Sequence, residues 1–184
     1  FDYIRQAINE TDQEKFDALN EKLVKYEEIT DRIEFEIASY LNEVSKGEIS
    51  AASGQRMKAM YKIIGEMESL GDSGEAIGRL LKRKFIHKKS FDEDMMKRLS
   101  KMLDYVEVAY QVMIENLKNK NLEDISNATD AEYNINECRN NLREEHIVNI
   151  ENNNYDYTSG VYYIDLVGEL EKIGDFIINI SESK

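Results

Sequence analysis

Two acidic octapeptides carry the residues of this chain whose types and spacing could do chemistry. They read GEMESLGD at residues 65–72 and GELEKIGD at residues 168–175, with five of the eight positions identical. The separation between the copies is constant at 103 residues (175 − 72). Each copy holds a glutamate and an aspartate four residues apart, namely Glu68 and Asp72 in the first and Glu171 and Asp175 in the second. On a helix this spacing places both carboxylates on one face, about one turn apart, where a hard cation could bind.

Long helices are the elements that must position these acids. The chain has 184 residues, of which 33% are charged and 41% hydrophobic, and it contains neither proline nor tryptophan. Because proline punctuates sheets, turns and helix starts, its absence favours long uninterrupted helices. No stretch of useful length alternates between apolar and polar residues, so the sequence predicts an all-α fold.

Capping residues, glycines and apolar periodicity predict six helices. Their expected ranges are about 2–8, 11–44, 50–87, 90–117, 122–150 and 158–181. Capping boxes that begin at Thr11 and Ser90 start the second and fourth helices. Serines at 50–53 cap the third helix, and Asn121 caps the fifth. The expected inward-facing stripes include Tyr26, Ile33 and Val44 on the second helix and Met60 and Met67 on the third.

The six helices divide into two copies of one three-helix unit. The third and sixth helices carry the octapeptides, and the second and fifth match weakly, with Glu27 and Asp31 opposite Glu132 and Asn136 (132 − 27 = 105). Residues 2–4 match 104–106, which pairs the first helix with the fourth. Only the last two turns of the first helix are then present in the sequence. The sequence therefore predicts a single domain over 1–184, with a first unit at 1–89 and a second at 90–184. Its first helix is expected to be truncated and to continue upstream of Phe1.

Composition excludes several classes of function. The net charge of −13 argues against nucleic acid as a partner. No apolar run approaches the ~20 residues that span a bilayer, and there is no signal-peptide pattern. The single cysteine, Cys138, excludes an internal disulfide and fits a reducing compartment. No Ser/His/Asp or Cys/His arrangement and no phosphate-binding glycine loop can be picked out, so the chain is not expected to be an enzyme.

One run of basic residues, 82–89, stands out in this acidic chain. Cations at a helix C-terminus are favoured by the helix dipole, which is the simpler interpretation. The functional alternative is contact with membrane headgroups or with the cytosolic face of a transporter.

The second octapeptide also resembles a family signature. Residues 171–175, followed by Asn179 and Ile180, resemble the E-R-I-G-D-x-x-x-N-I signature of the PhoU family, and residues 68–72 with Ile77 carry a weaker version. PhoU-like domains are two three-helix units in tandem, with an E/D-x-x-x-D motif on each of two helices per unit. The resemblance covers the whole chain and implies an elongated antiparallel helical bundle.

The resemblance implies metal ligands, because family members can hold iron or zinc clusters at these motifs. Carried over to this chain, the ligands are Glu27, Asp31, Glu68 and Asp72 in the first unit and Glu132, Asn136, Glu171 and Asp175 in the second. Asn136 stands where the motif has an acid, and an uncharged amide should make the second site weaker. The expected metals are Fe, Zn, Mn or Mg, since oxygen ligands favour hard cations. The alternative is that these acids are solvated helix flanks without a metal.

The family is implicated in phosphate homeostasis, both as a stand-alone cytosolic regulator and as the cytosolic C-terminal domain of bacterial sodium/phosphate cotransporters. The start at Phe1 favours the appended form. The expected partner is then a membrane transporter domain in the same chain or complex, together with a second copy in a homodimer, at the cytoplasmic inner face of the cell membrane. The alternatives are a stand-alone phosphate regulator and a structural helical module for oligomerisation, whose acids only maintain solubility.

Overall fold

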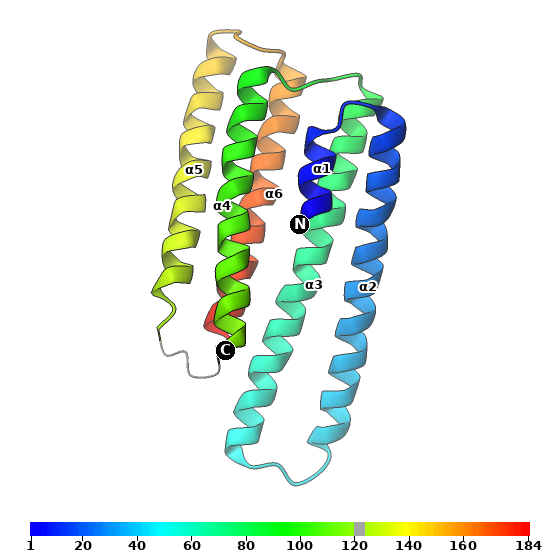
Figure 1. Ribbon diagram of the computed structural model, residues 1–184, viewed down its shortest axis with the longest axis vertical. Coiled ribbons are helices and arrows are strands. Elements are labelled where there is room, and N and C mark those ends of the chain that lie inside the picture. The colour runs from blue at the N-terminus through cyan, green and yellow to red at the C-terminus, as the bar shows by residue number, and fades with distance from the viewer. Residues whose placement is uncertain (120–123) are drawn as a thin grey trace.

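The computed structural model describes residues 1–119 and 124–184 and contains six helices in those ranges (Figure 1). They are α1 (Asp2–Asn9), α2 (Gln13–Ser45), α3 (Ala51–Ile86), α4 (Glu93–Lys118), α5 (Ser126–Glu151) and α6 (Tyr157–Glu182). Successive helices run antiparallel along one long axis, and no strand occurs in the described part of the chain. The predicted all-α, elongated antiparallel bundle is confirmed. The predicted cap Asn121 lies outside the described residues.

Aspartate side chains start three of the long helices. Asp12, Asp92 and Asp156 each accept a hydrogen bond from the backbone N–H three residues further on, at 3.0, 2.8 and 2.9 Å. The predicted capping boxes that begin at Thr11 and Ser90 are therefore wrong by one and two residues. An ionised carboxylate accepts from a helix N-terminal N–H more strongly than a hydroxyl does, which explains the difference. Ser50 caps α3 in the predicted region: its Oγ accepts a hydrogen bond from the backbone N–H of Ser53 at 3.1 Å.

The core is centred on α6, which contacts α3, α4 and α5 and so joins the first three helices to the last three. Leu166, Val167 and Leu170 of α6 are fully buried there. The second octapeptide overlaps this buried stretch, and the first lies on α3, which packs against both α2 and α6. Both acidic pairs are thereby fixed to helices that the core holds in place.

The far ends of α2 and α3 are an exception to the predicted burial. In Figure 1 these two helices extend past the start of α1 and past the ends of α4–α6 as a two-helix hairpin. The side chains expected to face inward but found exposed are Tyr26, Ile33, Val44, Met60 and Met67. Two helices can cover only part of each other's apolar stripe, so the prediction of burial was wrong for Ile33, Val44 and Met60. It was also wrong for Met67 and for Tyr26, whose ring centre lies 5.6 Å from that of Tyr3 on α1 and which is still half-exposed.

Glycine within each octapeptide permits a close approach between helices. A Cβ on Gly174 would lie 2.9 Å from Cδ1 and 3.2 Å from Cγ2 of Ile135 on α5. A Cβ on Gly71 would lie 3.2 Å from Cβ of Thr30 on α2. Thr30 and Ile135 are themselves 105 residues apart (135 − 30), the offset that relates α2 to α5. The glycine before each aspartate is therefore a packing residue, and the same contact sets the helix spacing in both units.

Two alanine substitutions on α6 are expected to have opposite effects on stability. Gly174→Ala should lower the free energy of unfolding by about 1 kcal/mol, because overpacking costs ~1–3 kcal/mol and exceeds the gain in helix propensity of about 1 kcal/mol. Gly168→Ala should raise it by up to about 1 kcal/mol, because nothing lies within 4 Å of the added methyl group. Urea unfolding measures both variants against the parent. Equal stabilisation by both would show that Gly174 is not a packing position.

Candidate metal centre

α2 and α3 bring three of the predicted carboxylates to one place. Glu27, Asp31 and Asp72 each offer one oxygen, and these three oxygens lie within 4.8 Å of one another. Glu27 is half-buried and the two aspartates are exposed. The contact between Thr30 and Gly71, each next to one of the aspartates, holds the two backbones close enough for carboxylates from both helices to meet. The donor set is oxygen only and open to solvent, which fits Mg²⁺, Mn²⁺ or Fe²⁺ better than a thiolate or imidazole metal.

Mutual repulsion is visible in the acid–base properties of this cluster. Partial burial raises the pKa of Glu27, and the carboxylates of Asp31, Glu75 and Asp72 raise it further. In the described part of the chain, none of Glu27, Asp31 and Asp72 forms an ion pair with a basic side chain. The cluster therefore carries uncompensated negative charge that a cation would neutralise.

Glu68 is not one of the three residues that converge. Burial raises the pKa of Glu68, followed by the charges of Asp72 and Glu34, while a hydrogen bond donated by the Ser69 hydroxyl at 3.3 Å opposes the rise. Glu68 thus borders the cluster one helical turn from Asp72. Sequence reasoning missed Glu34 and Glu75, whose charges raise the pKa of Glu68 and of Glu27, respectively. The available signal was their position three residues after Asp31 and Asp72, on the same helix faces.

The second unit arranges its four predicted residues differently. Asn136 Nδ2 donates to Glu132 Oε1 at 2.7 Å, and Arg139 Nη2 donates to Asn136 Oδ1 at 2.9 Å. The same Nη2 lies 3.2 Å from Glu171 Oε1 and forms an ion pair with it. Burial raises the pKa of Asp175, as do the charges of Glu171 and Glu132, whereas Arg139 lowers it. Sequence reasoning missed Arg139, although it stands 105 residues after Glu34 (139 − 34) and reverses its charge.

The basic run 82–89 does not form one continuous cationic surface. Lys84 is buried, with its Nζ 4.8 and 4.7 Å from the ring centres of Phe85 and Phe91, and burial lowers its pKa. His87 hydrogen-bonds the Tyr162 hydroxyl. Lys89 forms an ion pair at 3.0 Å with Asp156, the residue that caps α6. Lys84 is thus buried against the loop that follows α3, while His87 and Lys89 tie this loop to α6 and its cap.

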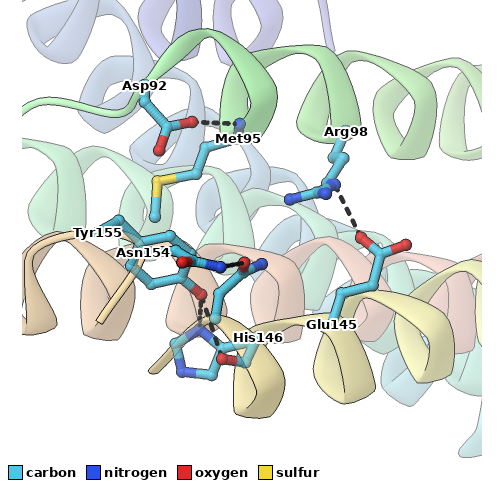
Figure 2. A network of polar contacts seen from close by, with 8 residues as sticks. Asp92, Met95, Arg98, Glu145, His146, Asn154 and Tyr155 are labelled. Atoms are coloured by element: carbon cyan, nitrogen blue, oxygen red, sulfur yellow. Dashed lines mark hydrogen bonds and ion pairs between the residues drawn. The ribbon is translucent and has the colours of Figure 1, made fainter. Parts of the chain in front are cut away.

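A polar network joins α4, α5 and the start of α6 at the opposite end from the α2–α3 hairpin tip (Figure 2). Arg98 Nε lies 2.7 Å from Glu145 Oε2, and His146 Nδ1 lies 2.5 Å from the Tyr155 hydroxyl. The rings of His146 and Tyr155 stack with centroids 5.8 Å apart. The contacts of this network hold the α5–α6 corner in shape.

The burial of His146 predicts a loss of stability in acid. Burial lowers the pKa of His146 below its ordinary value of 6.5. The unfolded chain then takes up a proton near that value while the folded protein resists, so stability is lost as pH falls from about 6.5 through the lowered folded pKa. Urea unfolding at pH 7 and pH 5 should show a smaller loss for His146→Gln than for the parent. Tyr155→Phe keeps the imidazole and should keep the parent's pH dependence; equal losses in all three proteins would contradict this role for His146.

Taken together, these features define an all-α protein of six helices, with matched sets of motif residues between α2 and α3 and between α5 and α6. Residues 99–183 match the family model described as the PhoU domain. Among solved structures the chain is similar to the phosphate transport system regulatory protein PhoU from Streptococcus pneumoniae, at a TM-score of 0.61 and 17% sequence identity. That match covers 90% of this chain and 77% of the other. No curated protein matches the sequence.

The expected resemblance to the PhoU family is thus confirmed: residues 99–183 match the model of its domain, and the chain has the fold of the solved PhoU structure. None of the helices in the ranges 1–119 and 124–184 is long and apolar enough to cross a membrane.

Proposed function

We propose that this chain is a non-catalytic regulator of phosphate transport that acts through contacts with a membrane phosphate transporter. The observation that carries the proposal is the match of residues 99–183 to the PhoU domain model, supported by the similarity in fold to the solved PhoU structure over 90% of the chain. The regulated transporter is proposed to be another part of the same protein or a separate partner. A sodium-dependent phosphate transporter is the proposed partner, at the cytoplasmic face of the membrane.

The test is phosphate uptake in cells that lack this protein. Uptake of radiolabelled phosphate should lose its dependence on the external phosphate supply, and expression of the intact protein should restore it. Expression of the Gly168→Ala protein, which is expected to fold normally, should restore this dependence as well as the intact protein does. Unchanged regulation of uptake in the deletion strain would refute a role in phosphate transport.

The acidic cluster of the first unit is the proposed metal site. Glu27, Asp31 and Asp72 would hold one divalent cation between α2 and α3, with Glu68 at its border. When bound, the cation would supply positive charge that offsets their repulsion and holds the two helices together. The three residues present their oxygens at one point from two helices, so the α2–α3 pair would be stiffer with the metal than without it.

A structural role in oligomerisation is a second candidate, favoured by the exposed apolar side chains of the α2–α3 hairpin. Phe35 is 72% exposed, and Ile33 and Met60 are also exposed. Covering these groups with a second copy would remove apolar surface from water. Sedimentation velocity should then show a dimer for the parent and a monomer for Phe35→Ser. A monomeric parent protein would eliminate this role.

A further inference from the structure

Arg139 lies in the second unit in contact with two of the expected metal ligands, Asn136 and Glu171. Its side chain is 19% exposed and that of Glu171 is 17% exposed, so their ion pair is only weakly screened by solvent. One nitrogen, Nη2, contacts Asn136 Oδ1 on its own helix α5 and Glu171 Oε1 on the facing helix α6. The guanidinium therefore links two helices through oxygen atoms, which is the task a cation would perform between α2 and α3.

The matched positions of the two units differ in charge. The first unit has Asp31 and Glu34 where the second has Asn136 and Arg139 (136 − 31 = 139 − 34 = 105). The full sets are Glu27, Asp31, Glu34, Glu68 and Asp72 against Glu132, Asn136, Arg139, Glu171 and Asp175. Five carboxylates in the first give a formal charge of −5, whereas three carboxylates and one guanidinium in the second give −2.

The atoms of the second set are also engaged with one another. Asn136 Oδ1, the oxygen that would replace a carboxylate ligand, accepts from Arg139, and Glu132 Oε1 accepts from Asn136 Nδ2. A divalent ion entering here would displace these hydrogen bonds and meet a fixed positive charge. The repulsion would persist, because an arginine side chain in a protein always carries its positive charge. The residues of the second unit therefore do not fit a metal ion.

We infer that Arg139 is the resident cation of the second unit and that Glu132, Asn136, Glu171 and Asp175 do not bind metal in this protein. The α5–α6 pair is held together by the side chain of the chain itself and has the same structure whatever the metal supply. The α2–α3 pair has no such side chain. Any response of this protein to a divalent cation is thereby confined to its first unit.

The decisive test gives the second set the acidic residues that the first set has at the matched positions. Asn136→Asp with Arg139→Glu is introduced into the full chain that already carries Asp72→Asn, so that the first-unit cluster is disabled in every arm. Equilibrium dialysis with Mn²⁺ should find no saturable site in the Asp72→Asn chain and one site per chain after the two further changes. Because the first unit is disabled throughout, this result is independent of whether the proposed first-unit site exists.

Two outcomes of this dialysis would overturn the inference. A site in the Asp72→Asn chain that disappears with Asp175→Asn would show that the second unit binds metal while Arg139 is present. Absence of binding in the rebuilt chain, with its helical circular dichroism intact, would show that Arg139 and Asn136 are not what excludes the ion.

A milder variant keeps the inference testable if the rebuilt chain does not fold. Arg139→Gln in the Asp72→Asn chain should lower Tm by about 5 °C, and millimolar Mn²⁺ should restore a large part of that loss. Arg98→Gln is the matched control. Arg98 on α4 forms an ion pair with Glu145 on α5, the helix that carries Arg139, but it lies outside the acidic set. Its Tm should also fall, without recovery in Mn²⁺. Equal recovery, or none, in both variants would overturn the assignment of Arg139 as a stand-in for a metal.

Discussion

Leu166→Ala is expected to lower the free energy of unfolding by about 3 kcal/mol. Leu166 is fully buried on α6, the helix that packs against α3, α4 and α5. Its truncation removes apolar contacts and leaves a cavity that rigid neighbouring helices cannot close, and such changes cost about 2–5 kcal/mol. Urea unfolding followed by circular dichroism should show a lower midpoint with an unchanged slope.

The shape of that transition carries further information about the two units. Because α6 contacts helices of both halves, the chain should unfold in a single transition, and Leu166→Ala should shift the whole of it. Val108→Ala on α4 is the control, since Val108 is exposed and its truncation should change stability by less than about 0.5 kcal/mol. Two separate transitions, only one of which responds to Leu166→Ala, would show that α6 does not couple the halves.

The helices were largely predictable because local signals specify them. Long apolar stripes without proline fix where a helix runs, and the structure places α3 at Ala51–Ile86 against an expected range of 50–87. Burial was less predictable, because it depends on neighbours that the pattern does not name. Ile33 and Met60 stand at helical spacing and yet are exposed, since only two helices meet at that end of the molecule. Periodicity identifies the apolar face of a helix but not the partner that covers it.

The acidic sites show the same division between local and tertiary information. Spacing places Glu68 and Asp72 on one face of α3. The contact between Thr30 and Gly71 then determines which turn of α3 lies opposite Asp31. Asp72 therefore joins the cluster while Glu68 borders it. Arg139 was missed for a different reason: it lies outside both the octapeptide and its matched acidic pair. Extending the repeat comparison by three residues would have revealed the exchange of Glu34 for Arg139.

Asp72→Asn is expected to abolish the response to metal and to stabilise the metal-free protein. The charge of Asp72 helps to raise the pKa of both Glu27 and Glu68. A carboxyl group whose folded pKa lies above its unfolded value opposes folding once it ionises, so this cost appears as pH rises through the folded pKa. Removing one charge lowers the cost, and the variant should therefore lose less stability than the parent between pH 4.5 and pH 7.

A bound cation should reverse the relative stabilities, so that the parent protein becomes more stable than the Asp72→Asn protein. At a Mn²⁺ concentration of ~100 Kd, binding to the folded parent protein adds about 2.7 kcal/mol to its stability. The Asp72→Asn protein lacks one of the three converging carboxylates and should show little or no shift in Tm with Mn²⁺. Asp175→Asn is the matched control, because it removes the equivalent acid of the second unit and should keep the parent's response. If Mn²⁺ shifts Tm equally in both variants, the converging carboxylates of α2 and α3 are not the site, since the one change that disrupts them would have had no effect.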